Sequence, residues 1–136
     1  MNEEIFVLTY SGNGKRVGIK VPEGDFIHKV SRVIDATQVF CITHKGFGFR
    51  FNLSDIRIMG GDTEGDSLIN IEEGDSLIEG ILLDEKDEKR NIEINTSLGE
   101  KINIPMIEIP ILKRGSQGVR LIKLFEKDDV ESARLI

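Results

Sequence analysis

The stretch that decides the fold covers residues 39–83 and reads VFCITHKGFGFRFNLSDIRIMGGDTEGDSLINIEEGDSLIEGILL. Its pattern recurs 53 positions further along the chain without a gap. Apolar residues fall on apolar residues, turn glycines on turn glycines and acids on acids, as in Gly46/Gly99, Phe49/Ile102, Phe51/Ile104, Asp55/Glu108, Ile56/Ile109, Gly65/Gly118, Leu68/Leu121 and Asp75/Asp128. One fold unit used twice gives such a match, and a period near 50 residues is typical of propeller-type blades.

The chain of 136 residues is predicted to form a single domain of blade repeats. The expected units cover about residues 1–38, 39–90 and 91–136. The first unit is abbreviated, because its turn at 12–14 matches 46–48 at an offset of 34, while 24–25 matches 74–75 at an offset of 50. About sixteen residues of the second unit are therefore missing from the first.

Alternating hydrophobicity predicts strands along most of the chain. Phe47, Phe49 and Phe51 alternate with Gly48 and Arg50, a spacing that places the rings on one face of a strand. We expect these rings in the core; a base-stacking platform is the alternative, and it requires exposed rings. No segment keeps a 3.6-residue apolar stripe over three turns, so the chain is predicted to be all-β.

The charges are unevenly distributed. The chain has a net charge of −6, and residues 56–90 alone carry four Lys/Arg against eleven Asp/Glu. A protein that binds nucleic acid mainly by phosphate neutralisation usually has a basic balance, so the composition argues against strong general nucleic-acid binding. The composition still allows a basic face to lie beside the acidic block.

Cysteine usage and the absence of a long apolar run bear on the compartment. The single Cys41 cannot form an intramolecular disulfide and lies in the apolar run 39–42, so a buried thiol is expected. No apolar stretch approaches the roughly 18 residues of a membrane span, and the first residues are acidic, unlike a secretory signal. We therefore predict a soluble, cytoplasmic protein.

No catalytic, metal or cofactor site is predicted. His28 and His44 have no Cys or carboxylate neighbours at metal-ligand spacing, and Tyr10 lies at a turn. The loop at 60–66 has three glycines but also three acids, and no Lys-Ser/Thr follows it, so it is not expected to cradle phosphate. The acid pairs Glu72-Glu73 and Asp128-Asp129 are expected to be turn residues.

Several stretches resemble one known family. THKGFGFRF at 43–51, followed by SDIRIMG at 54–60 and EEGD at 72–75, looks like a repeat of the C-terminal domain of the A protein of bacterial DNA gyrase and of its topoisomerase IV counterpart. SQGVRLIKL at 116–124, followed by DDV at 128–130, resembles the second half of the same repeat. The opening TYSGNGKR at 9–16 is similar to the way such a domain begins, so the resemblance covers essentially the whole chain.

The resemblance implies four-stranded antiparallel blades in a β-pinwheel, as a non-catalytic domain of a type II topoisomerase. It also implies basic residues on the outer rim that bind and bend duplex DNA through its phosphates, without reading bases. Duplex DNA and topoisomerase subunits are the implied partners. The matching rim positions are Lys15, Arg16, Lys45, Arg50, Lys113, Arg114, Arg120 and Lys123.

The chain departs from that family in two ways. It has fewer units than a complete domain, and the motif Gln-Arg-Gly-Gly-Lys-Gly has only a degenerate relative, KRGSQG at 113–118. Too few blades to close a ring leave sheet edges open, which predicts either a fragment or a protein that assembles with copies of itself. The alternative function is a β-repeat protein-interaction domain that has lost DNA affinity, with the acidic block 56–90 facing a basic partner.

Overall fold

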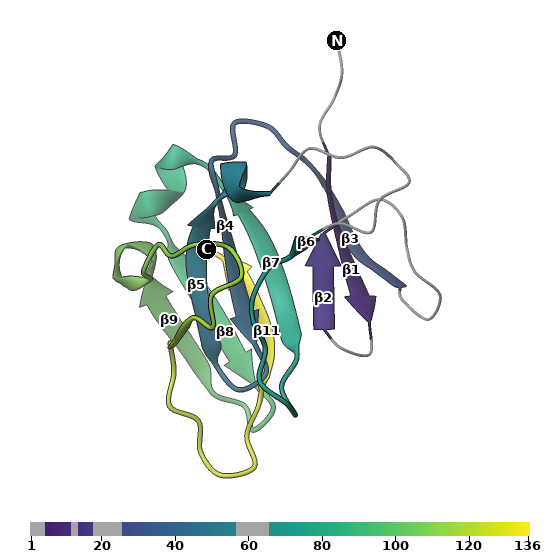
Figure 1. The fold of residues 1–136 in the computed structure, drawn as a ribbon. Helices are drawn as coiled ribbons and strands as arrows, with labels where there is room; N and C mark the ends of the chain where they lie inside the picture. The colour runs from purple at the N-terminus through teal and green to yellow at the C-terminus, as the bar shows by residue number, and fades with distance from the viewer. Residues whose placement is uncertain (1–4, 12–13, 18–25, 57–65) are drawn as a thin grey trace.

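The computed structural model describes residues 5–11, 14–17, 26–56 and 66–136, which form three sheets (Figure 1). The strands are β1 (Ile5–Ser11), β2 (Gly14–Val17), β3 (Phe26–Arg32), β4 (Gln38–Thr43), β5 (Phe47–Asn52), β6 (Asp66–Ser67), β7 (Leu77–Leu83), β8 (Asn91–Thr96), β9 (Lys101–Pro105), β10 (Val119–Arg120) and β11 (Val130–Leu135). Short 3-10 helices are η1 (Leu53–Asp55), η2 (Glu85–Lys89) and η3 (Met106–Glu108). The all-β prediction is confirmed. Among the described residues, no helix has the length and apolar character needed to cross a membrane.

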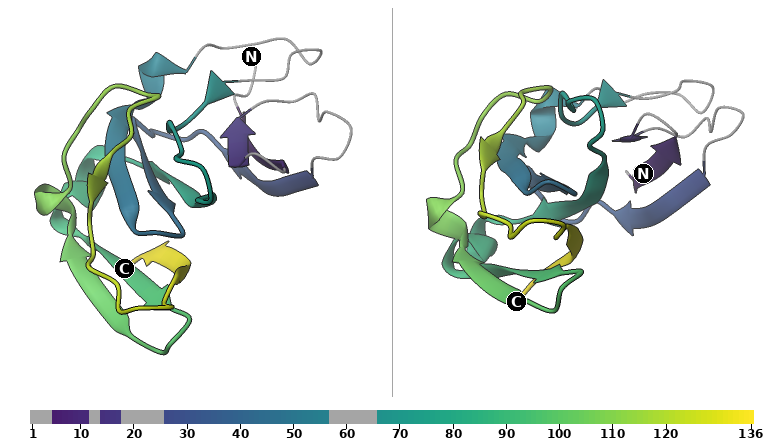
Figure 2. Two further views of the ribbon diagram at one scale, coloured as in Figure 1. Left: turned by 60° about the horizontal axis from the view of Figure 1, so that its bottom comes forward. Right: turned by 90° about the horizontal axis from the view of Figure 1, so that it is seen from below.

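Two of the three sheets are completed by a strand from further along the chain. The first sheet has the order β3-β1-β2-β6, the second β7-β4-β5-β10 and the third β11-β8-β9. β6 follows β5 in sequence but pairs with β2, and β10 follows β9 but pairs with β5. We name residues 53–76 and 106–129, which contain these two strands, the crossing segments (Figure 2).

The 53-residue repeat in the sequence is also a repeat of strand register. Every described pair between β4 and β5 has its counterpart between β8 and β9 at this offset, as in Val39↔Phe51 and Ile92↔Ile104 or Phe40↔Arg50 and Glu93↔Asn103. The pairing of β4 with β7 and of β8 with β11 agrees in the same way. The matched apolar positions therefore face matched sides of their sheets.

The abbreviated start of the chain has a structural explanation. The connection between the second and the last strand contributed by each unit has 24 residues in the second and third sheets, but eight residues, 18–25, in the first. The difference of sixteen agrees with the number expected from the turn offsets. The length that is missing is the part that, in the later sheets, reaches back to the preceding sheet. Residues 18–25 themselves lie outside the described residues.

Strand β4 separates two cores because successive side chains point to opposite faces. Val39 and Cys41 pack in one core with Phe49, Phe51 and Phe6 of the first sheet. Phe40 and Ile42 face the other core, which they share with the third sheet. The second sheet therefore holds the other two together.

Three of the four phenylalanines of the decisive stretch are core residues, as predicted, whereas Phe47 is half-buried. Phe40, Phe49 and Phe51 are fully buried, and a base-stacking role is wrong for these three rings. The centroids of Phe49 and Phe51 lie 5.8 Å apart with the rings tilted by 44°, a favourable arrangement for aromatic pairs. Each buried ring contributes roughly 1.5–3 kcal/mol through apolar burial. Cys41 is also buried, and burial raises the pKa of its thiol, which therefore stays protonated at neutral pH.

Arg50 joins the second sheet to the crossing segment that follows it. Its backbone amide donates to the carbonyl of Pro110 at 2.8 Å, and its carbonyl accepts from the amide of Leu112 at 2.7 Å. These two bonds form a parallel bridge between Arg50 and Ile111 on the edge of β5 that faces away from β4. The backbone of residues 110–112 thereby takes the place of a further strand.

The side chain of Arg50 reinforces the same junction. It is only 3% exposed, and its Nε donates to the carbonyl of Ile109 at 2.9 Å. Its Nη1 lies 3.2 Å from Oε1 of Gln38 and 2.6 Å from Oε2 of Glu88 in η2. One planar guanidinium thus links η2 and the residue that follows η3 to the second sheet, which a point-charge ammonium could not do with the same geometry.

We predict that Arg50→Ala lowers the free energy of unfolding by about 2 kcal/mol, because it removes the buried partner of the Ile109 carbonyl. Urea unfolding followed by circular dichroism measures the change. Lys123→Ala, an exposed change of a cation, is the matched control and should stay within about 0.5 kcal/mol of the unaltered chain. Equal stability of Arg50→Ala and Lys123→Ala would contradict the assignment.

Candidate nucleic-acid interface

The structure separates the eight basic positions into three groups. Four side chains are exposed, those of Lys45, Lys113, Arg120 and Lys123. Arg114 is half-buried and Arg50 is buried. Lys15 and Arg16 lie on β2, but their side chains are outside the part of the chain that the structure describes.

Arg50 does not lie on the exposed rim where the resemblance placed it. The following crossing segment covers the edge of β5, so a position that would face solvent in an isolated strand becomes an internal junction. Its guanidinium is engaged by three partners within the chain. It holds the interface together rather than presenting a charge at the surface.

Arg114 also makes internal contacts. Its Nη1 donates to the carbonyl of Ser67 at 2.7 Å and its Nε to the carbonyl of Asp55 at 3.0 Å. Its backbone amide donates to Oδ2 of Asp55 at 3.2 Å. Arg114 therefore ties the second crossing segment to the first, and three of its donor groups are occupied.

Arg120 is the exposed cation whose position is best defined. Its guanidinium carbon lies 5.2 Å from the ring centroid of Phe47, which is within the range of a cation–π contact. β10 pairs with β5 at this point, in the register Arg120↔Phe47. Phe47 is half-buried, so the ring supports Arg120 from below while the charge stays accessible to solvent.

Contacts between the segment 120–122 and the turn at 45–46 bring Lys45 and Lys123 close to Arg120. The amide of Leu121 donates to the carbonyl of Gly46 at 2.8 Å, which joins the segment after Arg120 to the turn that carries Lys45. A Cβ on Gly46 would come within 2.9 Å of Cγ1 of Ile122, so this turn lies directly against the residue before Lys123. We name Lys45, Arg120 and Lys123 the rim patch.

The turn that carries Lys45 is fixed by an aspartate. The amide of Lys45 donates to Oδ1 of Asp75 at 3.0 Å, and Gly46 has a φ of +89°, which other residues rarely adopt. The amide of Ser76 donates to the same oxygen at 2.8 Å. The turn that carries Lys45 is thus held to the Asp75 turn through one carboxylate oxygen.

Acidic residues lie beside the rim patch. Glu72 and Glu73 are exposed in the turn that also contains Asp75. They reduce the positive potential near Lys45, because exposed charges interact over about 8–10 Å at physiological salt. The acidic loop at 60–66 falls almost entirely outside the described residues. Within the described part of the chain, the rim patch is therefore a small positive area with acids beside it.

Phe47 was missed as a site residue by sequence reasoning, which placed it in the core. Its link to Arg120, 73 positions later in the chain, depends on pairing between strands from different units. Hydrophobic alternation within β5 carries no signal of that contact. Phe47 is half-buried and Phe49 is buried, although the alternation places both on the same face of β5.

Comparison with known proteins agrees with this architecture. The family model described as "DNA gyrase C-terminal domain, beta-propeller" matches residues 37–82 and 107–136, which is more than half of the chain. The chain belongs to this family. The matched part of the gyrase A protein is its C-terminal domain, which is not the catalytic part of a type II topoisomerase.

Two curated relatives show how much of a longer protein is represented. The chain is similar to the gyrase A protein of Borrelia hermsii, with 28% identity over 118 residues, 87% of this chain and 14% of the relative. It is also similar to the corresponding protein of DNA topoisomerase 4 from Bacillus subtilis, with 22% identity over 127 residues, 93% of this chain and 14% of the relative. The chain thus spans about one-seventh of the length of these gyrase-family relatives.

Solved structures show the same fold. The C-terminal domain of DNA topoisomerase IV superposes with a TM-score of 0.86 at 19% identity, over 100% of this chain and 47% of that one. The E. coli ParC C-terminal domain gives a TM-score of 0.75 at 14% identity, over 99% of this chain and 62% of that one. The predicted β-pinwheel fold and the predicted family resemblance are confirmed.

The gyrase-family turn that holds Lys45 is repeated in the third sheet around Asp128. Oδ1 of Asp128 accepts from the amides of Leu98 and Asp129 and from Oγ of Ser97, each at 2.9 Å. Burial works to raise the pKa of Asp128, but the hydrogen bonds from Leu98, Thr96, Ser97 and Asp129 outweigh it and hold the pKa below its usual value. The charged form is therefore favoured by folding.

A carboxyl group whose pKa is lowered in the folded state adds stability above its unfolded pKa, about 3.9, and this stability is lost as the pH falls through the lower folded value. We therefore expect the melting temperature of the chain to fall more steeply below about pH 4 than that of Asp128→Asn, which keeps the acceptor oxygen. Calorimetry between pH 6 and 2 measures this difference. Glu126→Gln, an exposed change in the same turn, is the control. Identical pH profiles for the chain and Asp128→Asn would refute the role of this carboxylate.

Proposed function

We propose that this gyrase-family chain binds duplex DNA through its phosphates and bends it, without reading base sequence. The observation that carries the proposal is the supported position of Arg120, which lies over Phe47 beside the turn of Lys45 at the completed edge of the second sheet. Arginine and lysine side chains at such an edge contact phosphate oxygens, which fixes the path of a duplex without sequence information.

The exposed cations support a path along the second crossing segment. The rim patch lies at the start of β5, and Lys113 follows residues 110–112, which bridge to Arg50 near the end of that strand. A strand of this length spans roughly 17 Å, which is about half a helical turn of duplex DNA. Contacts at two points separated by this distance can favour a bent path, and smooth bending of a site costs roughly 1–6 kcal/mol.

The same contacts predict the strength of binding. Four phosphate contacts give a slope of about −3.6 in a plot of log K against log salt concentration. Such binding weakens roughly 100-fold between 50 and 200 mM salt. Because the chain has a net charge of −6, it should bind duplex DNA weakly on its own. Lys15 and Arg16 on β2 are proposed as further contacts along the first sheet.

The partners and location follow from this proposal. The two relatives named above belong to DNA gyrase and topoisomerase IV, so we propose that the chain acts on DNA beside topoisomerase subunits that carry the catalytic chemistry. This would take place in the cytoplasm. Self-association is a further proposal, and size-exclusion chromatography with light scattering tests it. The alternative is binding of a basic protein partner, which the exposed Glu72 and Glu73 favour.

The decisive experiment removes the rim patch. We expect the triple variant Lys45→Ala/Arg120→Ala/Lys123→Ala to reduce the magnitude of the salt slope by about 2.7, because three phosphate contacts are lost. Fluorescence anisotropy with a labelled duplex at several salt concentrations measures the slope. Fluorescence energy transfer between the two ends of the duplex reports bending.

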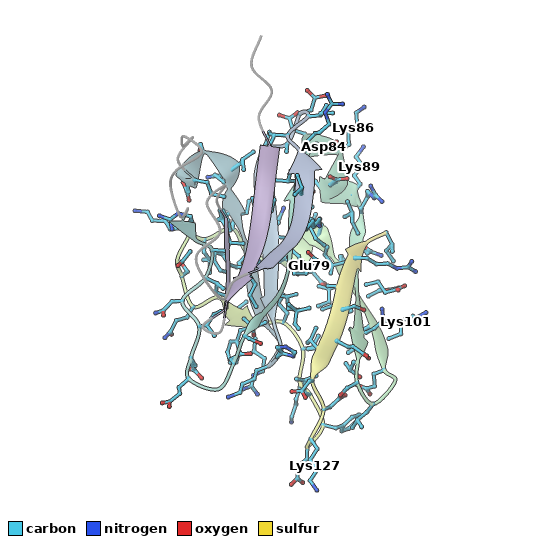
Figure 3. The ribbon with its side chains drawn as sticks, turned by 90° about the vertical axis from the view of Figure 1, so that its right-hand side faces the viewer. Glu79, Asp84, Lys86, Lys89, Lys101 and Lys127 are labelled. Carbon is cyan, nitrogen blue, oxygen red and sulfur yellow. The ribbon has the colours of Figure 1, made fainter. Side chains whose placement is uncertain are left out.

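The matched control removes three exposed lysines from other positions. Lys86→Ala/Lys89→Ala/Lys101→Ala changes the net charge by the same amount, with two positions on η2 and one on β9 (Figure 3). Its slope should stay near that of the unaltered chain. An equal decrease in both triple variants would show that the rim patch is not the contact surface. No binding to duplex at about 50 mM salt would eliminate the DNA proposal and leave the protein-interaction alternative.

A further inference from the structure

The third sheet lacks the strand that completes the other two. β2 pairs with β6 and β5 pairs with β10, but within the described residues β9 has β8 as its one partner. β9 occupies the same register position as β5, offset by 53 residues. Its free edge corresponds to the edge of β5 that accepts a crossing segment.

Strand β5 accepts that segment partly through its backbone. Besides the two bonds of Arg50, the carbonyl of Gly46 accepts from the amide of Leu121. The corresponding groups on β9 belong to Asn103 and Gly99, and the equal register turns them toward the same side. Backbone pairing alone would therefore permit a crossing segment on β9 as well.

Two side-chain features of β5 go beyond backbone pairing. The first is Gly48, over which Gly118 crosses: a Cβ on Gly118 would be 2.9 Å from the carbonyl oxygen of Gly48. A Cβ on Gly48 would be 2.4 Å from the carbonyl oxygen of Cys41 on β4 and 2.8 Å from Cδ1 of Leu121 on the crossing segment. The second is Arg50, whose guanidinium holds the carbonyl of Ile109 at the start of the crossing. One feature makes room for the segment and the other anchors it.

Both features are absent at the matching positions of β9. Lys101 stands where β5 has Gly48, and Asn103 stands where it has Arg50. Both side chains are exposed, and lysine on an edge strand opposes strand addition, because pairing would force its charged side chain against the incoming chain. Figure 3 shows Lys101 projecting from the side of the third sheet.

We infer that β9 is an edge closed to crossing segments, and that Lys101 and Asn103 close it. The two crossing segments of the described chain are already used on the first and second sheets. A second copy of this chain therefore does not join through β9.

The test uses a synthetic peptide with the sequence of residues 106–124, the part of the second crossing segment that contains β10. It is added to the isotope-labelled full chain and to the full-length variant Lys101→Gly/Asn103→Arg, and amide shifts and hydrogen exchange are followed by NMR. We expect no shifts on β9 of the unaltered chain and rapid exchange of the Asn103 amide. In the variant, we expect shifts along 99–105 and exchange slowed at least about 10-fold at position 103 when peptide is present.

Two controls separate peptide binding at β9 from nonspecific peptide binding and from misfolding. Lys127→Gly/Ser132→Arg makes the same kinds of change at exposed positions away from β9, and should not bind the peptide there. A peptide carrying Gly118→Val should not bind either, because Gly118 has a φ of +77° and no room for a larger side chain. Dispersed spectra of each variant confirm that it is folded.

The outcomes are decisive in both directions. Binding of the peptide to β9 of the unaltered chain would overturn the inference, as would concentration-dependent protection of Asn103, which would indicate pairing between copies. Absence of binding to both the unaltered chain and the folded double variant would refute the assignment of closure to Lys101 and Asn103. Binding to the variant alone supports it.

Discussion

The junction between β5 and residues 109–112 is the interaction on which the rest of the structure depends. Two backbone hydrogen bonds of Arg50 continue the second sheet into the chain that follows β9. Phe49 and Phe51 on this covered strand are fully buried, whereas the register-matched Ile102 and Ile104 on β9 remain partly exposed. The same junction places β10 against Phe47 and so determines where Arg120 can lie.

The buried guanidinium of Arg50 contributes more to specificity than to stability. Removing a charge from water is unfavourable, and a buried ion pair often does no better than well-packed apolar residues. Here the acid partner, Glu88, is about half exposed, so the pair keeps part of its hydration. The guanidinium also needs acceptors from β4, from η2 and from the residue that follows η3 at the same time. Such a set is satisfied in one arrangement of the second and third sheets, which excludes a shifted register.

The sequence was sufficient to predict the all-β fold, the repeat and the buried thiol, because these depend on local alternation and on a period that needs no gap. It also predicted that the first unit lacks about sixteen residues, but not that the missing length is the part that reaches back to the preceding sheet in the later units. The crossing segments could not be predicted, since they pair strands from different units and no local pattern records that contact. Arg50 shows the consequence: its place in the alternation of β5 is that of a solvent-facing residue, and a segment about 60 positions later buries it.

Many charged side chains of both signs make contacts within the chain. Arg50 and Arg114 hold the crossing segments, and Arg90 and Arg134 pair with Asp87 and Glu93. Several acids are likewise engaged, with Asp55, Asp75 and Asp128 bonded to backbone amides of turns and crossing segments. The net value of −6 therefore describes the surface poorly, because many of the charges of both signs are committed to the fold.

The completed edge of the second sheet presents a few cations in fixed positions, supported by Phe47 and by the Asp75 turn. The positions of these cations are set by the crossing segment, and overall charge carries no information about them.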